Sequence, residues 1–421
     1  MTLDEVFAYI HKVDWRGSIP GLSRIDGLLD KLDHPERQMK YVHVTGTNGK
    51  GSTCAMVASV LREAGYKTGL YTSPYIRRFH ERMQINGVPI GDDDLCALVE
   101  KIRPLADSMD DSPTEFELVT AIAFTWFAQQ KCDIVVCEVG MGGEFDATNV
   151  IPAPEVAALC AIGLDHTAML GDTIEKIAAT KSGIIKSGCR AVLYPAEPSV
   201  EAIVRRRCET ENVPLAAADV SALTPLSHSL EGQVFRWRDM DDLHLPLLGS
   251  HQLRNAATAL TILEALQERG WHITEGHIRA GLAAAEWPGR FQVLHRQPLI
   301  VLDGGHNPQC MAALTENIRD YLPHRPLTVL TGVLGDKDFG RMYDGLAPLT
   351  VRFVTVTPQN PRALPADELA ALLSQYGKPV TACSSIPEGV STALAQTPAD
   401  GAILVCGSLY LLGDVMDALD A

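Results

Sequence analysis

The fold prediction starts from residues 45–53, which read Thr45-Gly46-Thr47-Asn48-Gly49-Lys50-Gly51-Ser52-Thr53. This glycine-rich segment follows the apolar run 41–44 and precedes residues 54–64, which have helical spacing. Its glycines let the backbone turn N–H groups inward around a phosphate chain, and a helix that starts at Ser52 would add its positive end. We expect Lys50 to supply a cation for the outer phosphates, and Ser52 or the threonine after it to offer a hydroxyl group to Mg²⁺.

The alternative for this segment is an ordinary glycine-rich turn with a solvated lysine. The spacing from Gly46 to Gly49 is shorter than in the usual phosphate-binding loop, and Gly51 replaces the usual serine or threonine after the lysine. A Gly-Lys-Gly-Ser run between a strand and a helix nevertheless favours a nucleotide phosphate site.

Short apolar runs that end in Gly- or Asp-rich loops and are followed by helical patterns recur along the chain. They occupy residues 41–44, 134–139, 156–162, 299–302, 327–330, 351–356 and 402–406. Continuous apolar runs are typical of strands that are covered on both faces. Strands that alternate with helices predict an α/β fold with a mostly parallel sheet.

The length of 421 residues indicates two or three domains. A boundary is predicted near Trp287-Pro288-Gly289-Arg290, where a helical stretch stops at a Pro-Gly turn and a new strand–loop–helix series begins. We therefore expect one domain at residues 1–290 and a smaller one at 297–421. The less periodic stretch 195–245 is expected to hold antiparallel strands at a sheet edge.

Composition excludes several classes of protein. A formal charge of −16 argues against nonspecific binding of nucleic acid. No apolar run approaches the roughly 18–20 residues that span a bilayer, and the N-terminus lacks the order of charges of a secretory signal. The ten cysteines include no Cys-x-x-Cys pair, which indicates reduced thiols rather than disulfides or zinc. We expect a soluble, cytoplasmic protein that does not bind a membrane.

Polar residues follow two of the predicted strands. Glu138 lies near the end of the run 134–139, and His166 follows the run 156–162. Because ligands of parallel sheets lie beyond the carboxyl ends of the strands, both residues are expected to face the phosphate loop. A buried carboxylate is costly unless it is paired or holds a metal, so Glu138 is a candidate Mg²⁺ ligand. Taken singly, each residue could instead be a helix cap or a surface group, and Lys181 reads as a solvated charge.

Together, ordered motifs along nearly the whole chain resemble one family. The motifs are Gly-Thr-Asn-Gly-Lys-Gly-Ser (46–52), Tyr-Thr-Ser-Pro (71–74), Asp-Ala-Thr-Asn (146–149), Leu-Asp-His-Thr (164–167), Leu-Gly-Asp-Thr (170–173), Lys-Ser-Gly-Ile-Ile-Lys (181–186), Trp-Pro-Gly-Arg-Phe-Gln (287–292), Asp-Gly-Gly-His-Asn-Pro (303–308) and Gly-Ser-Leu-Tyr-Leu-Leu-Gly (407–413). The chain resembles the folylpolyglutamate synthase/dihydrofolate synthase group of the Mur ligase superfamily.

The resemblance implies a P-loop-containing, parallel-sheet central domain and a smaller Rossmann-like α/β C-terminal domain. It also implies an ATP-dependent ligase that adds L-glutamate to the γ-carboxylate of a folate, and to dihydropteroate, through an acyl phosphate. This chemistry suits a carboxylate, which is a poor electrophile until it carries a phosphate leaving group. Two Mg²⁺ ions and a monomer are expected, and the need for a monovalent cation stays open.

The resemblance also assigns residue roles. It places ATP at Gly49, Lys50, Gly51, Ser52, Asn255, Arg290, Asp303 and His306. It places Mg²⁺ at Ser73, Glu138 and His166. It places the folate or pterin at Thr114, Glu115, Phe116, Phe145, Asp146 and Ala147. Lys50, His166, Lys181 and Arg290 would take part in catalysis, with Lys181 as N6-carboxylysine.

Some of these assignments have alternatives in the sequence. Thr114-x-x-Glu117 also reads as a helix capping box, and Phe116 as a core residue. Glu144 stands where many bifunctional relatives have arginine, which leaves the use of dihydropteroate open.

Two other functions fit part of the pattern. A cell-wall precursor ligase of the same superfamily would need a separate domain before the phosphate loop, where this chain has only about forty residues. A non-ligase regulatory P-loop protein would not need Glu138, His166 and Lys181 together.

Overall fold

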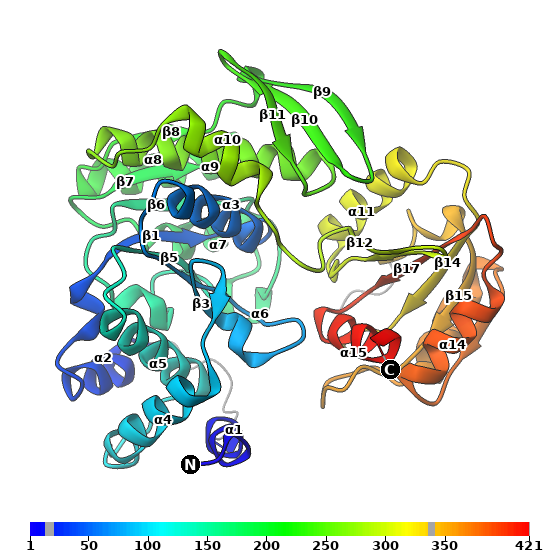
Figure 1. Cartoon of the computed structure of the whole chain (residues 1–421), viewed down its shortest axis with the longest axis horizontal. Coiled ribbons are helices and arrows are strands. Elements are labelled where there is room, and N and C mark those ends of the chain that lie inside the picture. The colour runs from blue at the N-terminus through cyan, green and yellow to red at the C-terminus, as the bar shows by residue number, and fades with distance from the viewer. Residues whose placement is uncertain (13–20, 336–341, 421) are drawn as a thin grey trace.

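The computed structural model describes residues 1–12, 21–335 and 342–420. It shows two α/β units with separate sheets, and a small third sheet that lies on the first unit (Figure 1). The chain passes once between the units, from α10 (Glu275–Ala283) to β12 (Gln292–Arg296).

The larger unit is built on an eight-stranded sheet in the order β4-β3-β2-β5-β1-β6-β7-β8. The strands are β1 (Lys40–Thr45), β2 (Thr68–Tyr71), β3 (Met83–Ile85), β4 (Val88–Pro89), β5 (Ile134–Glu138), β6 (Val156–Leu159), β7 (Arg190–Leu193) and β8 (Leu215–Ala217). From β2 to β8 every neighbouring pair is parallel, while β3 and β4 add an antiparallel edge.

Helices cover both faces of this sheet. Val42 and Val44 of β1 pack into a core with α3 (Lys50–Glu63), α9 (Ser250–Glu268) and α10, whereas Tyr41 packs into a second core on the opposite face. That second face is covered by α1 (Leu3–Lys12), α2 (Ser23–Asp30), α4 (Asp92–Asp107) and α5 (Glu115–Gln129). The central strands are buried on both sides, which is why they read as continuous apolar runs.

The smaller unit has a six-stranded sheet in the order β12-β13-β17-β14-β15-β16. Its further strands are β13 (Leu299–Leu302), β14 (Leu327–Thr331), β15 (Thr350–Thr355), β16 (Val380–Ala382) and β17 (Ala402–Cys406). Only β12 runs antiparallel to its neighbour. One face packs on α11 (Pro308–Tyr321) and α13 (Ala366–Leu373), and the other on α14 (Ile386–Gln396) and α15 (Leu409–Asp420).

The predicted strands are confirmed, but two details of the sequence interpretation are wrong. Helix α3 begins at Lys50, two residues before the predicted Ser52. The stretch 195–245 begins with α8 (Pro198–Glu211) and β8, and its antiparallel strands form their own sheet. These strands are β9 (Leu223–Ser229), β10 (Gly232–Trp237) and β11 (Met240–Leu245). They stay off the edge of the large sheet because Phe235 and Trp237 are buried against its helices.

The boundaries predicted at 290 and 297 stay a prediction, although β12 adds residues 292–296 to the smaller sheet. Among the described helices, none has the length and hydropathy needed to cross a membrane.

Candidate active site

The phosphate loop lies between β1 and α3, at the carboxyl end of a central strand. Gly49 is the N-cap of α3 and has a φ of 83°, a left-handed conformation that favours glycine. A Cβ atom at Gly49 would lie 2.4 Å from Asn255 Oδ1, so the side chain of α9 closes against the loop. Lys50 Nζ donates to Thr47 O over 3.3 Å, which holds the ammonium group over the loop.

Glu138 and Ser73 lie beside this loop. Glu138 ends β5, the strand next to β1, and only 4% of it is exposed. Its Oε2 accepts from Ser73 N over 3.2 Å, and its Oε1 lies 3.9 Å from Lys50 Nζ. Burial raises the pKa of Glu138, and Lys50 opposes this shift.

These contacts leave the buried Glu138 carboxylate short of partners, which fits a hard cation with oxygen ligands. In the described residues no three His, Cys, Asp or Glu side chains gather into a metal cage. A single buried carboxylate suits Mg²⁺, because this ion binds through one or two carboxylates and completes its shell with phosphate and water. The carboxylate of Glu138 therefore fits a Mg²⁺ site, and Ser73, whose backbone N–H donates to it, stays a predicted ligand.

Lys181 reaches the same loop from α7 (Ile174–Ser182). Only 4% of it is exposed, and its Nζ donates to Gly46 O over 2.9 Å. Burial, together with the charge of Lys50, lowers the pKa of Lys181 to about 7. A large share of this amine is therefore uncharged near neutral pH, the state in which an amine is nucleophilic.

The smaller unit contributes Asp303 to the candidate site. Asp303 follows β13 and is buried, and its two carboxylate oxygens accept from Phe291 N (2.9 Å) and Gly305 N (2.7 Å). Burial raises the pKa of Asp303, and Arg290 opposes this. Arg290, in the segment that connects the units, also opposes the rise in the pKa of Glu138, so its charge acts on the site beside the phosphate loop.

His306 and Asn255 complete the predicted ATP set. Gly304 O accepts from His306 Nδ1 over 2.8 Å, which assigns the ring proton to that nitrogen. Asn255 is buried in α9 and donates to Gln252 over 3.0 Å, and Gln252 in turn donates to Ser52 Oγ over 3.2 Å. The structure thus brings the predicted residues of both units to one place.

Comparison with known proteins agrees with this arrangement. Residues 44–263 match the Mur ligase middle domain, and residues 289–409 match the Mur ligase glutamate ligase domain. A folylpolyglutamate synthase of Lacticaseibacillus casei is 38% identical over 100% of this chain and 99% of its own length. The chain belongs to the folylpolyglutamate synthase/dihydrofolate synthase family of Mur ligases.

Further relatives support this membership over the full length. A Bacillus subtilis dihydrofolate synthase/folylpolyglutamate synthase is 35% identical, covering 96% of each chain. The crystal structure of a Mycobacterium tuberculosis folylpolyglutamate synthase complexed with ADP and AMPPCP superposes with a TM-score of 0.91 at 31% identity, covering 100% and 99% of the two chains. The predicted Mur ligase fold is therefore confirmed, and family membership replaces the cell-wall and non-ligase alternatives.

In this family member, His166 differs in setting from the other predicted metal ligands. It precedes the short helix α6 (Thr167–Leu170) with a φ of 50°, and half of its side chain is exposed. Its Nε2 lies 4.0 Å from Asp165 Oδ2. A second metal ion on His166 stays a prediction.

The predicted folate residues form two groups in this ligase. Thr114 caps α5 by accepting from Glu117 N, so the capping box is present. Phe116 packs against Gly140, in the segment that follows β5, because a Cβ atom at Gly140 would lie 2.4 Å from its ring. Glu115 pairs with His11 (3.5 Å).

The second group is held by a network that the sequence interpretation missed. Asp146 Oδ1 accepts from the hydroxyl of Thr148 over 2.6 Å, and its Oδ2 accepts from Met141 N over 2.8 Å. The Thr148 hydroxyl therefore accepts from His43 Nε2 (2.8 Å). Burial lowers the pKa of His43 to about 3 and keeps it neutral. The sequence feature that could have indicated this network is His43, a polar residue inside the otherwise apolar run 41–44.

The remaining predicted positions differ in exposure. Phe145 is 52% exposed, whereas Ala147 is buried. Residues Asp336 to Asp338, which resemble glutamate-binding positions of the family, lie outside the described residues.

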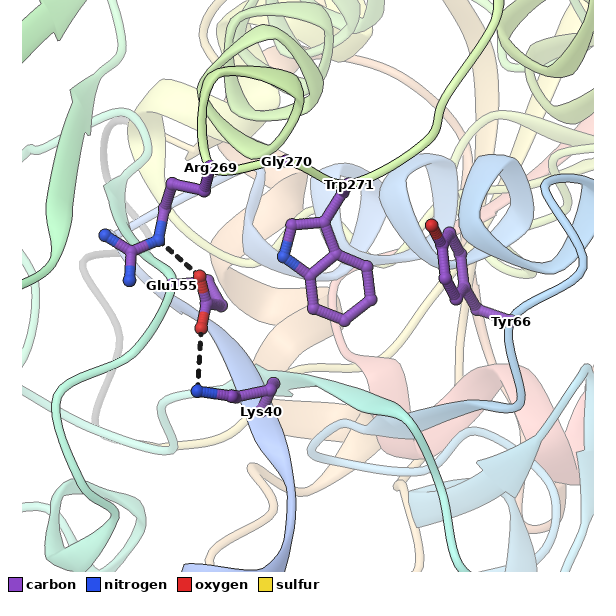
Figure 2. Close-up of a pocket in the computed structure, with 6 residues that line it drawn as sticks. All are labelled: Lys40, Tyr66, Glu155, Arg269, Gly270 and Trp271. Atoms are coloured by element: carbon purple, nitrogen blue, oxygen red, sulfur yellow. Dashed lines mark hydrogen bonds and ion pairs between the residues drawn. The ribbon is translucent and has the colours of Figure 1, made fainter.

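An open surface pocket lies elsewhere in the molecule (Figure 2). It has a volume of about 430 Å³ and is lined by Lys40, Tyr66, Glu155, Arg269, Gly270 and Trp271. Lys40 begins β1, so the pocket lies at the opposite end of that strand from the phosphate loop. Glu155 pairs with Lys40 (3.2 Å) and with Arg269, and these charges satisfy one another. We therefore interpret the charged residues that line this pocket as an ion-pair cluster with a structural role.

This cluster leads to a stability prediction. Burial raises the pKa of Glu155, but Arg269 and Lys40 together outweigh burial and lower it. Glu155→Ala should reduce the free energy of unfolding at pH 7 by about 1–2 kcal/mol, since Lys40 and Arg269 are partly solvated. Because the folded pKa is depressed, the contribution is present above the unfolded pKa and is lost as pH falls through the folded one.

Urea unfolding at pH 7 and pH 3.5 measures this difference. Glu201→Ala, which breaks an exposed pair with Arg205, is the matched control and should change stability by less than about 0.5 kcal/mol. An equal loss for Glu155→Ala at both pH values would contradict the ion-pair explanation.

Proposed function

We propose that this enzyme uses ATP to add L-glutamate to the γ-carboxylate of a folate, and also to dihydropteroate. The observation that carries the proposal is that Lys50 and Glu138 of the larger unit and Arg290 of the connecting segment act electrostatically on one site beside the phosphate loop. A carboxylate held there can attack the terminal phosphate of ATP, and the resulting acyl phosphate can accept the amino group of glutamate.

The phosphate loop performs the first part of this reaction. Its backbone amides and the start of α3 would bind the phosphates at Gly49, Gly51 and Ser52, with Lys50 on the outer oxygens. Lys50 would also stabilise the charge that moves onto the leaving phosphate. Arg290 would approach the terminal phosphate from the segment that connects the two units.

Ser73 and Glu138 would hold Mg²⁺, which neutralises phosphate charge when it is bound. We propose a second Mg²⁺ at His166, and carboxylation of Lys181. In that step the neutral Nζ attacks CO₂, a nitrogen–carbon bond forms, and a proton leaves to water. The carbamate would place an anionic oxygen beside Gly46, where the amine now lies.

The remaining contacts of ATP would come from α9 and from the start of α11. Asn255 would contact adenine, Asp303 the ribose, and His306 would lie beside the nucleotide. The buried polar groups of Asn255 and Asp303 are already oriented by hydrogen bonds, so little ordering is needed on binding.

We propose that the acceptor binds between Thr114–Phe116 and Phe145–Ala147. Both carboxylate oxygens of Asp146 accept hydrogen bonds from within the chain. We therefore propose that Asp146 maintains the shape of its loop. The exposed ring of Phe145 and the ring of Phe116 would give apolar surface to the pterin. The names of the relatives support a folate-type acceptor, and an Escherichia coli structure described in complex with DHPP and ADP has a TM-score of 0.88 at 30% identity, covering 100% and 98% of the two chains.

We further propose a cytoplasmic monomer, with residues 1–290 binding ATP and the folate, and residues 297–421 binding glutamate. All ten cysteines are free thiols, which suits a reducing compartment. The requirement for a monovalent cation is a further question for assay.

An ADP-release assay with Mg²⁺-ATP and L-glutamate tests the proposed function. Tetrahydrofolate and dihydropteroate are supplied in parallel reactions, and ADP release is expected with both. ADP release with tetrahydrofolate alone would restrict the enzyme to tail extension. No glutamate-dependent ADP release with either acceptor would overturn the proposal.

A further inference from the structure

The side chain of Asn48 joins the phosphate loop to the smaller unit. Its Nδ2 donates to Gln309 Oε1 over 2.7 Å. Its Oδ1 accepts from Asn307 Nδ2 and from Cys310 Sγ, each over 3.1 Å. The backbone N–H of Asn48 donates to Ala161 O over 3.1 Å, so the residue is held from both sides.

Its partners lie at the start of α11. Asn307 caps this helix by accepting from Cys310 N over 2.8 Å, so its amide group has a defined orientation. The same segment carries Asp303 and His306, which belong to the proposed ATP site. On the other side, Asn48 precedes Gly49, the left-handed N-cap of α3.

We propose that Asn48 is a positioning residue that sets the phosphate loop in register with the adenosine-binding segment of the smaller unit. Because Asn48 directly precedes Gly49, this junction lies at the phosphate loop itself. A nucleotide that contacts both the loop and that segment gains affinity when they are already in register, because less ordering is needed on binding. The inference rests on the proposed ATP site and does not depend on the identity of the acceptor.

Other contacts between the units lie away from the phosphate loop, and two regions illustrate them. Arg77 pairs with Asp417 and with Asp420 of α15. His228 of β9 packs on Tyr321, at the far end of α11, with ring centroids 5.0 Å apart. His228 therefore offers a matched control, because it touches the same helix at the other end.

The test measures the affinity of the full-length protein for Mg²⁺-AMPPCP by calorimetry, in Asn48→Ala, Gln309→Ala, the double variant and His228→Ala. Asn48→Ala should weaken binding about tenfold, and Gln309→Ala at least about threefold, through lost hydrogen bonds. The double variant should match Asn48→Ala within about twofold, since the residues act as a pair. His228→Ala should bind as the wild type does. Circular dichroism checks the fold of each variant.

Three results would overturn the inference. Wild-type affinity in Gln309→Ala would mean that Asn48 acts on the nucleotide directly. Multiplied effects in the double variant would mean that the two residues act independently. Equal weakening in His228→Ala would assign the effect to docking of the units in general. Binding of AMPPCP without glutamate ligation would overturn the proposed function and leave this inference standing.

Discussion

Replacing Lys50 by alanine should lower kcat about 1,000-fold while the fold stays intact. Lys50 Nζ lies 3.9 Å from the buried carboxylate of Glu138 and donates to Thr47 O. Losing a preorganised charge that faces a developing anion costs roughly 10²–10³ in kcat. The stability cost should be small, because the buried carboxylate can take up a proton when its cation is removed.

ADP release under saturating substrates measures the activity, and thermal unfolding checks the fold. Lys176→Ala is the matched control, since Lys176 is an exposed lysine of α7 that pairs with Asp172 over 2.8 Å. It should keep wild-type activity. Full activity in Lys50→Ala would remove the phosphate-loop assignment.

Replacing Lys181 by alanine should lower kcat about 100-fold, with partial recovery on addition of acetate or formate. A short carboxylate can occupy the cavity and supply the anionic oxygen that the carbamate would provide. Methylamine should not restore activity, because a cation cannot replace that oxygen. Recovery with methylamine and not with acetate would show that Lys181 acts as an amine.

The wild-type enzyme should also depend on bicarbonate in a manner set by pH. The pKa of Lys181 is lowered to about 7, so the amine is mostly neutral at pH 8 and mostly protonated at pH 6. Because CO₂ reacts with the neutral amine, depletion of bicarbonate should reduce activity more at pH 6 than at pH 8. A ¹³C carbamate signal after addition of labelled bicarbonate checks the modification directly. Its absence from a fully active enzyme would exclude the carbamate.

Much of the fold could be predicted from local patterns. The runs at β1, β5, β6 and β13 are apolar because both faces of these strands are covered, and this is visible without any tertiary information. The shorter strands were missed. The edge strand β8, with only three residues, is partly exposed and therefore has no continuous apolar run.

The candidate site, like the fold, was predictable from the sequence only where local patterns determine it. The glycines and the lysine of the phosphate loop predicted its chemistry, because a tight backbone turn before a helix needs those residue types. The capping box at Thr114 could also be read directly, since its partners are three residues apart. Local spacing determines contacts of this kind.

Contacts between distant segments were decided only by the tertiary structure. Asn48 and Gln309 are 261 positions apart, and Thr148 lies 105 positions from His43. The uncharged character of Lys181 depends on burial by several elements and on the charge of Lys50. The sequence alone thus determined the longer buried strands, the turn of the phosphate loop and the helix cap at Thr114, because those preferences act over a few residues. Packing decided which polar groups meet and which ionisable groups stay charged, because desolvation and Coulomb interactions depend on distance in space.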